Sequence, residues 1–322
     1  MIDPAEFAAA AEAIGQADEI ALGCHVGPDG DALGSMIGFG MAAVNAGKKV
    51  IAGFGSPFSV PSNLAFLPLG LLVAPDDFPA SPELMVVFDA GSQERLAELG
   101  SAAGDAGRLI VVDHHVTNVG FGDIALVDPA AAASAVIVVR LLDTLGWPIT
   151  ADIATCLHTA LVTDTGRFQY ANTSPDTLLL AARLVEAGAR PEQISQKVYE
   201  EAPFGYIKAA GAALSRATLD ADLSMVSTVV TQEDLDEAGI DWGDIDNLIN
   251  TLRLAEEADV AVLAKVSDSQ VKLSLRSRGG TDVGSLAAEL GGGGHRLASG
   301  FTFAGQAESA LDEIRKRIEA HR

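Results

Sequence analysis

The sequence is poor in cysteine and in basic residues. Its two cysteines, Cys24 and Cys156, are too few for a disulfide framework and lie in no C-x-x-C zinc pattern, which indicates reduced, packed thiols in a reducing compartment. Lysine and arginine total 21 against 44 acidic residues, giving a formal net charge of −23. Binding of long duplex DNA needs many contacts from basic side chains to phosphates, so we expect that the chain does not bind it.

The chain also lacks a long unbroken apolar segment. Its first residues do not form the basic and then apolar regions of a secretory signal, and the apolar stretch 135–142 is interrupted by Arg140. We therefore expect a cytoplasmic protein without membrane contact. With 322 residues and 48% hydrophobic content, the sequence can bury a full core and favours two domains over one.

Three apolar runs, residues 19–24, 85–88 and 109–112, have the length and composition of buried parallel strands and are separated by helical or loop stretches. Polar residues follow each run directly: His25, Asp29 and Asp31 after the first, Asp89 after the second, and Asp113, His114 and His115 around the end of the third. Ligands of open α/β sheets bind outside the carboxyl ends of the strands. The pattern predicts that these three clusters converge at one edge.

The remaining sequence predicts a second α/β unit. Residues 151–216 have a helical pattern, and we place a connector at 190–216 between domains at 1–189 and 217–322. Beyond it we expect strands at 223–230, 258–266 and 271–276, the last two as a hairpin, and helices at 244–254, at 282–290 and from about residue 308.

The first polar cluster has the composition of a metal site. One imidazole and two carboxylates lie within seven residues, and Gly27, Pro28 and Gly30 favour an irregular loop. Such donors suit Mn²⁺ or Mg²⁺, with the imidazole favouring manganese. A turn with a solvated histidine is the alternative, just as Asp89 could merely cap the turn that follows it.

Other residues have comparable alternatives. Asp164 follows an apolar helix, where the helix dipole disfavours a carboxylate unless a positive group compensates it; an ordinary exposed aspartate is the other interpretation. Ser274 and Arg276 alternate on one strand, so they share a face on which the guanidinium could bind phosphate. The glycine run 291–294, followed by His295, could expose N–H groups to an anion or be a flexible linker.

Together these motifs resemble a known family. His25-x-x-Pro28-Asp29-x-Asp31, Asp89, Asp113-His114-His115 and Thr163-Asp164-Thr165-Gly166 are similar to the four motifs of the DHH superfamily, in order. Residues 291–295 with Ala298-Ser299-Gly300 resemble the DHHA1 signature, and the NrnA-like branch is the most similar. The resemblance implies an N-terminal DHH domain with a parallel sheet flanked by helices, a smaller C-terminal α/β DHHA1 domain, an active site in the interdomain cleft, and a homodimer.

The resemblance also implies roles for individual residues. Two Mn²⁺ ions per chain are expected, with Mg²⁺ as the alternative: His25 and Asp29 would hold one ion, Asp31, His114 and Asp164 the other, and Asp89 would bridge them. His115 and Asp113 would be catalytic, His115 facing the scissile phosphate and Asp113 orienting the histidines. The implied substrate-binding residues are Ser274, Arg276, Gly292, Gly293, Gly294 and His295.

The implied function is metal-dependent hydrolysis of short oligoribonucleotides, of 3′-phosphoadenosine 5′-phosphate, or of both. Cyclic or linear dinucleotides such as c-di-AMP and pApA are alternative substrates, and a metal-dependent nucleotide sensor is the alternative without catalysis. The glycine-rich C-terminal motif disfavours a manganese inorganic pyrophosphatase. The low basic content disfavours a processive exonuclease acting on long strands.

Overall fold

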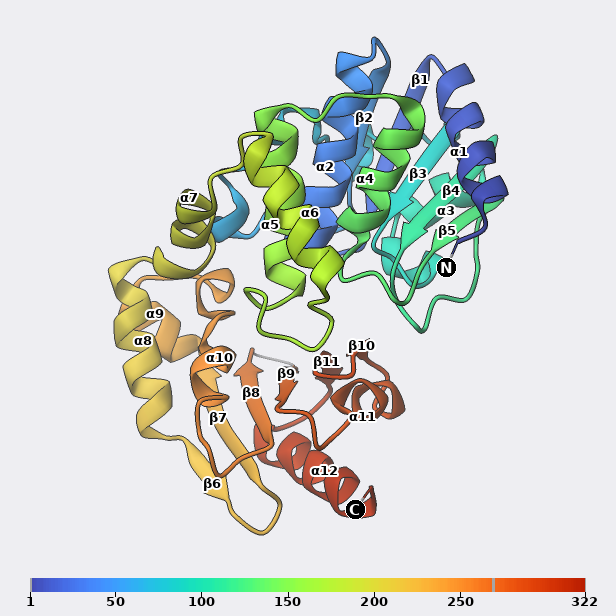
Figure 1. Ribbon diagram of the computed structural model, residues 1–322. Coiled ribbons are helices and arrows are strands. Elements are labelled where there is room, and N and C mark those ends of the chain that lie inside the picture. The colour runs from blue at the N-terminus through green and yellow to red at the C-terminus, as the bar shows by residue number, and fades with distance from the viewer. Residues whose placement is uncertain (1, 268–269, 322) are drawn as a thin grey trace. The chain divides into compact units, whose positions relative to one another are not determined.

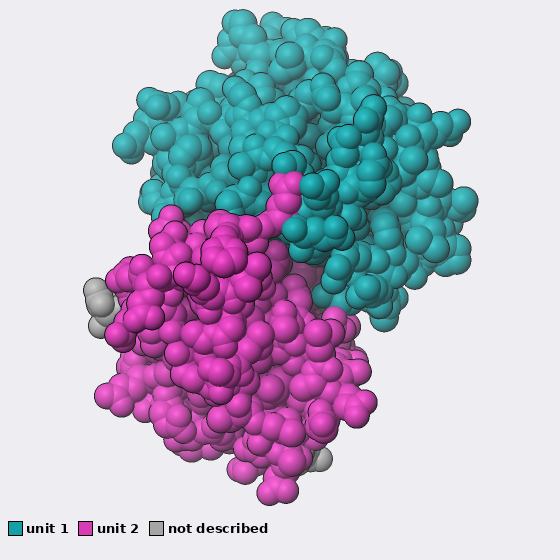
Figure 2. All heavy atoms as spheres, turned by 90° about the vertical axis from the view of Figure 1, so that its left-hand side faces the viewer, with its two compact units in different colours: residues 1–200 teal, residues 201–322 magenta. Residues whose placement is uncertain are grey.

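The computed structural model describes residues 2–267 and 270–321, and it divides the chain into two compact units, residues 1–200 and 201–322 (Figures 1 and 2). Each unit is built around its own sheet. The predicted α/β class, with a parallel sheet in the N-terminal domain, is confirmed. Among the described residues, no helix combines the length and apolar character needed to cross a membrane.

The first unit contains a five-stranded sheet in the order β2-β1-β3-β4-β5, and every neighbouring pair is parallel. The strands are β1 (Glu19–Cys24), β2 (Lys49–Gly53), β3 (Leu84–Phe88), β4 (Arg108–Asp113) and β5 (Ile124–Val127). The three predicted strands are thus β1, β3 and β4, which lie side by side. The strand order reverses direction between β1 and β3, so a crevice is expected at the carboxyl ends of these two strands.

Alternating side chains of this sheet enter two cores. Leu22, Val86 and Ile110 pack with α1 (Pro4–Gln16), α2 (Gly30–Asn45), α4 (Ser134–Leu145) and α5 (Ala151–Asp164). Ala21 and Met85 face the other way, toward α3 (Leu99–Gly104). The sheet is therefore buried on both faces, as an all-parallel sheet must be.

Glycines bring α2 and α5 into close contact. A Cβ atom at Gly34 would lie 2.4 Å from the carbonyl oxygen of Cys156, and one at Gly30 would lie 2.4 Å from Oγ1 of Thr163. Only glycine permits this approach, because any side chain would collide with the neighbouring helix. The close packing places Asp31, in the first turn of α2, near Asp164, the last residue of α5.

The rest of the first unit consists of short elements and two further helices. They are the 3₁₀ turns η1 (Ser62–Leu64), η2 (Leu69–Leu71), η3 (Pro75–Asp77) and η4 (Gln93–Leu96), the helices α6 (Pro175–Glu186) and α7 (Pro191–Ser195), and the π-helical turn η5 (Gln196–Glu200). The unit boundary falls after Glu200, inside the expected connector. Ile194 and Val198 join the first unit's core, whereas Ala209 and Ala213 join a core of the second, so apolar packing divides that stretch.

The second unit has a mixed six-stranded sheet in the order β10-β11-β9-β8-β7-β6, with only β7 and β8 parallel. Its strands are β6 (Thr218–Asp220), β7 (Met225–Thr231), β8 (Val260–Val266), β9 (Val271–Ser277), β10 (Gly293–His295) and β11 (Ala298–Phe303). Its helical elements are α8 (Phe204–Ser215), α9 (Gln232–Ala238), η6 (Trp242–Ile245), α10 (Leu248–Leu252), α11 (Val283–Glu289) and α12 (Ala307–Ala320). Helices α11 and α12 cover one face, and α8, α9 and α10 cover part of the other.

Two expectations for this unit differ from the structure. The helix expected at 244–254 is two short pieces, η6 and α10, because Asp241 and Asp244 form a capping box that starts a separate turn. The glycine run, interpreted from the sequence as an anion site or a flexible linker, lies partly in a strand: Gly293 and Gly294 are in β10, paired with β11. A Cβ at Gly292 would lie 2.2 Å from the Gly300 carbonyl oxygen, so the close neighbour at that glycine is the adjacent strand.

Candidate metal centre

The polar residues predicted to converge do lie together in the first unit. His25 follows β1, Asp89 follows β3, and His114 and His115 follow β4, whose last residue is Asp113. Asp29 is the N-cap of α2 and Asp31 lies in its first turn, while Asp164 comes from the end of α5. Strand ends and helix ends therefore supply this cluster at the carboxyl edge of the sheet.

Two sets of donors share Asp89. In the first set, Nε2 of His25 lies 3.5 Å from Oδ2 of Asp89 and 3.9 Å from Oδ1 of Asp29. In the second set, Nε2 of His114 lies 3.5 Å from Oδ1 of Asp89, 3.6 Å from Oδ2 of Asp31 and 3.5 Å from Oδ2 of Asp164. The two carboxylate oxygens of Asp89 thus face different histidines, as those of a bridging ligand would.

The donors fit divalent cations. Nδ1 of His25 lies 3.1 Å from the Val26 carbonyl and Nδ1 of His114 lies 3.1 Å from the Ala131 carbonyl. Carbonyls only accept hydrogen bonds, so Nδ1 carries the hydrogen and each Nε2 faces carboxylate oxygens. Ligands held about 2.1 Å from a common ion lie roughly 3 to 3.5 Å apart, similar to the spacings within the two sets. In this tautomer Nε2 and the carboxylate oxygens all carry lone pairs and no hydrogen. A cation between them, or a proton on Nε2, would therefore be needed to offset their repulsion.

The charged groups of the cluster shift one another's pKa values. Burial raises the pKa of Asp164 to about 7, with help from the nearby Asp89 carboxylate. Burial and Asp89 likewise hold the pKa of Asp31 well above its usual value. Burial alone would lower the pKa of His114, but Asp164, Asp31 and Asp89 raise it to about 10. The site thus concentrates negative charge, which a bound cation would relieve.

Asp89 differs from the other buried carboxylates. Burial would raise its pKa, but His25, His115 and His114 together lower it well below its usual value. Its backbone has φ of 56°, a left-handed conformation that non-glycine residues seldom adopt, and its N–H donates to the Val112 carbonyl at 2.9 Å. Strained backbone of this kind clusters at functional sites.

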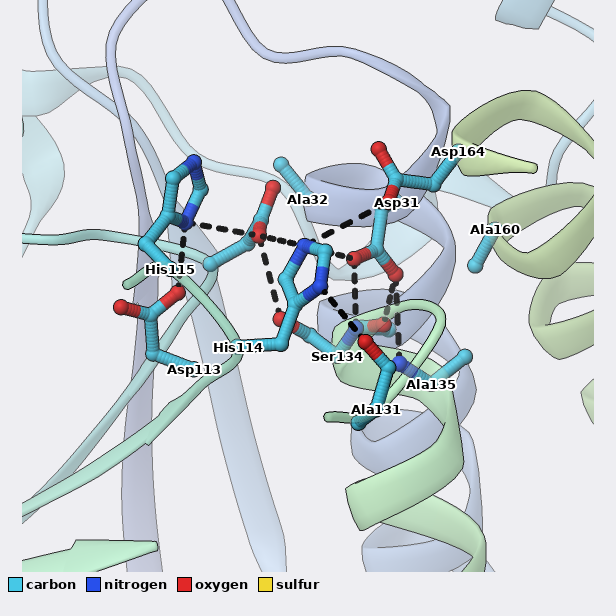
Figure 3. A network of polar contacts seen from close by, with 12 residues as sticks. Asp31, Ala32, Asp113, His114, His115, Ala131, Ser134, Ala135, Ala160 and Asp164 are labelled. Atoms are coloured by element: carbon cyan, nitrogen blue, oxygen red, sulfur yellow. Dashed lines mark hydrogen bonds and ion pairs between the residues drawn. The ribbon is translucent and has the colours of Figure 1, made fainter. Parts of the chain in front are cut away.

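Ser134, a residue that the sequence reasoning missed, connects two carboxylates of the cluster. Its N–H donates to Oδ2 of Asp31 at 2.6 Å (Figure 3), and its hydroxyl donates to Oδ1 of Asp89 at 3.1 Å. The N–H of Ala135 and the hydroxyl of Ser35 both donate to Oδ1 of Asp31, at 3.2 Å and 2.8 Å. Asp31 is thus held by the N-terminus of α4, where the helix dipole favours negative charge.

His115 has a different environment from His114. Its Nδ1 lies 2.7 Å from Oδ1 of the buried Asp113, and Asn118, also missed, donates to Oδ2 of Asp113 at 2.6 Å. Burial would lower the pKa of His115, but the Asp113 carboxylate raises it. The Asp113 contact fixes Nδ1 as the donor, so any contact with a reacting group falls to Nε2. The two adjacent histidines therefore have different partners.

The predicted substrate residues lie in the second unit, and Ser274, Arg276 and His295 share one face of its sheet. Gly300 pairs with Ser274, Ala298 pairs with Arg276, and His295 pairs with Ala298. Cross-strand partners point to the same face, so Arg276 and His295 lie on one face. They are two strands apart, which corresponds to about 10 Å. Leu273 and Leu275 point to the opposite face, into the core with α11 and α12. The partners of Ser274 and Arg276 on β11, Gly300 and Ala298, are small, and all four residues are partly exposed.

Comparison with known proteins identifies both units. The family model described as "DHH family, N-terminal domain" matches residues 19–161, and the model described as "DHHA1 domain" matches residues 223–321. The chain is 34% identical over 305 residues to the bifunctional oligoribonuclease and PAP phosphatase NrnA of Thermus thermophilus, covering 93% of this chain and 90% of that protein. It is 28% identical to the protein of the same name from Bacillus subtilis, over 88% of each chain.

Solved structures agree on the fold. An exopolyphosphatase-related protein from Bacteroides fragilis superposes with a TM-score of 0.90 at 26% identity, covering 100% of this chain and 97% of that one. RecJ from Thermus thermophilus in complex with Mn²⁺ has a TM-score of 0.53 at 14% identity, covering 98% of this chain and 54% of that one. The second likeness concerns the fold alone.

Proposed function

This chain belongs to the DHH family of phosphoesterases with a DHHA1 domain, and from that premise we propose that it uses two divalent cations to hydrolyse short oligoribonucleotides and 3′-phosphoadenosine 5′-phosphate. The observation that carries the proposal is the pair of donor sets sharing Asp89. The names of its relatives support the substrates.

Each donor set would hold one ion. His25, Asp29 and Asp89 form the first site, and Asp31, His114 and Asp164 form the second, with Asp89 contributing to both. The mixture of oxygen and imidazole donors suits Mn²⁺ best and Mg²⁺ next. When bound, such ions supply positive charge that activates water and neutralises phosphate oxygens.

The protein's own groups then have separate tasks. Ser134 and the N-terminus of α4 hold the Asp31 and Asp89 carboxylates in place. Asp113 accepts a hydrogen bond from Nδ1 of His115 and raises the pKa of the ring, which favours the imidazolium form; its Nε2 would donate a proton to the leaving oxygen of the ester. In the second unit, Ser274, Arg276, His295 and the glycines at 292–294 would bind the rest of a short nucleotide, with Arg276 pairing with a phosphate.

The test is a hydrolysis panel with Mn²⁺ or Mg²⁺. Its substrates are RNA of two to five nucleotides, 3′-phosphoadenosine 5′-phosphate, linear and cyclic di-AMP, and pyrophosphate. We expect turnover of short RNA and 3′-phosphoadenosine 5′-phosphate, and its loss in Asp89→Asn but not in Asp18→Asn, which changes an exposed carboxylate of the same unit. Turnover of cyclic di-AMP alone would replace the proposed substrates, and unchanged activity of Asp89→Asn would refute the metal centre.

The family resemblance also leads us to propose a homodimer. Size-exclusion chromatography with light scattering would test this, since a monomer at micromolar concentration would refute it.

A further inference from the structure

Asn172 connects the end of α5, which carries Asp164 of the second donor set, to the loop before α4, whose Ala131 carbonyl faces His114. Its side-chain amide donates to the Ala132 carbonyl at 3.0 Å and to the Asp164 carbonyl at 3.2 Å. Asp164 supplies a carboxylate to the set, and Ala132 follows Ala131, whose carbonyl faces Nδ1 of His114. The Asn172 amide therefore joins the main chain of Asp164 to the loop whose Ala131 carbonyl orients His114.

The segment before Asn172 has a defined path. Gly166, Arg167 and Phe168 have φ values of 55°, 63° and 61°, which fold the chain back after α5. The N–H of Phe168 donates to Oγ1 of Thr165 at 3.1 Å. The ring of Tyr170 lies against Gly166, where a Cβ would approach it to 2.2 Å. The chain is thereby returned toward the end of the helix it has just left.

The segment after Asn172 is fixed by the start of α6. Ser174 is the N-cap, Pro175 occupies the first turn, and Ser174 and Thr177 form a capping box. Oγ1 of Thr177 also donates to the Asn172 carbonyl at 3.5 Å. Both flanks of Asn172 are thus anchored, so its amide is presented to the two carbonyls without a large cost in chain entropy.

We propose that Asn172 is a positioning residue for the second metal site, setting the separation between Asp164 and His114. The inference rests on the proposed function, because it assumes that this donor set binds a cation. An amide suits the task, since it offers two N–H donors to two carbonyl acceptors. A carboxylate of the same shape offers none at neutral pH and would place negative charge against both carbonyls.

The experiment is calorimetric titration of Mn²⁺ into the metal-free full chain. Asn172→Ala and Asn172→Asp should each weaken one of two binding events by about 10-fold or more, as is typical when a group that orients a ligand is lost. The other event should stay within about twofold of wild type. Asn172→Gln, which keeps the amide, should recover part of the affinity.

Asn63→Ala is the matched control. Nδ2 of Asn63 donates to the Val198 carbonyl at 3.2 Å, so this variant loses the same type of bond in the same unit without contacting either loop. We expect both alanine variants to lower the melting temperature of the metal-free protein by similar amounts, while only Asn172→Ala loses metal affinity.

The outcomes separate the two claims. A wild-type chain that binds no Mn²⁺ overturns the proposed function and this inference together. Two binding events in wild type, with both unchanged in Asn172→Ala, overturn the role of Asn172 alone. Equal loss of affinity in Asn63→Ala also overturns it, because the effect would then be one of general stability.

Discussion

Replacement of Ser134 by alanine tests how the protein holds its bridging carboxylate. The hydroxyl of Ser134 is fully buried and donates to Oδ1 of Asp89, the oxygen that faces His114. The substitution removes this one bond and keeps the backbone N–H bond to Asp31, because the main chain is unchanged. Alanine is also a good helix former at the first position of α4.

The size of the effect follows from the type of bond. A hydrogen bond to a charged group contributes about 1.5 to 3 kcal/mol, and loss of a partner that orients a metal ligand costs about 10- to 100-fold in metal affinity. At 1.36 kcal/mol per decade, that loss corresponds to about 1.4 to 2.7 kcal/mol, so the two estimates agree. We therefore expect Mn²⁺ to bind Ser134→Ala about 10- to 100-fold more weakly than it binds wild type.

The assay is the rate of 3′-phosphoadenosine 5′-phosphate hydrolysis as a function of Mn²⁺ concentration. Activity of Ser134→Ala should be low at micromolar Mn²⁺ and mostly recovered at saturating metal. Thr228→Val is the control, since it removes a buried hydroxyl that donates to the Ala213 carbonyl in the second unit. A metal requirement within twofold of wild type, or an equal shift in Thr228→Val, would refute the role of Ser134.

Further predictions follow from the same contacts. Asn118→Ala should lower kcat about 10-fold with little change in KM, because Asp113 loses a hydrogen-bond donor and therefore orients His115 less firmly. Steady-state kinetics at saturating Mn²⁺ would measure this, and an effect on KM alone would contradict it. Arg276→Ala should instead raise KM about 10-fold or more, whereas Lys316→Ala, an exposed control, should not. Gly34→Ala should lower the free energy of unfolding, measured with urea, by about 3 kcal/mol, because its Cβ would lie 2.4 Å from the Cys156 carbonyl oxygen. A decrease of less than about 1 kcal/mol would mean that α2 and α5 can move apart to accommodate the methyl group. Chelation by EDTA should lower the melting temperature of wild type by more than that of Asp89→Asn, and an equal decrease in both would contradict the role of Asp89 in metal binding.

The sequence was sufficient to predict the three central strands of the first unit, β1, β3 and β4, and the convergence of the polar residues at their ends, but not the outer strands β2 and β5. Buried parallel strands read as short apolar runs, and a polar residue directly after such a run lies at the ligand-binding edge. His25, Asp89 and His114 could therefore be predicted from local patterns. Their roles as metal ligands remain a prediction that the structure makes geometrically reasonable.

Ser134 and Asn172 could not be predicted in the same way. Ser134 contacts Asp31, which lies 103 positions earlier in the chain, and a serine at a helix start gives no sign of such a partner. Asn172 precedes a recognisable helix cap, yet its bonds to Ala132 and Asp164 depend on three consecutive left-handed residues. Long-range packing and unusual backbone conformations leave weak traces in a single sequence.

The glycine run shows a different limit. Consecutive glycines indicate that the backbone approaches something closely, but not what it approaches. At Gly292 and Gly294 the structure gives the adjacent strand as the neighbour: a Cβ at Gly294 would lie 2.6 Å from the Ala298 carbonyl oxygen. No side chain in the segment indicated strand pairing, because glycine has low strand propensity.

The central claim is that two cations share Asp89, and the most direct test is the stoichiometry and electron paramagnetic resonance spectrum of Mn²⁺ bound to wild type and Asp89→Asn. We expect two ions per wild-type chain with a spectrum of magnetically coupled manganese, and loss of that coupling in Asp89→Asn with at least one ion bound more weakly. One uncoupled ion in wild type, or an identical coupled pair in Asp89→Asn, would contradict it.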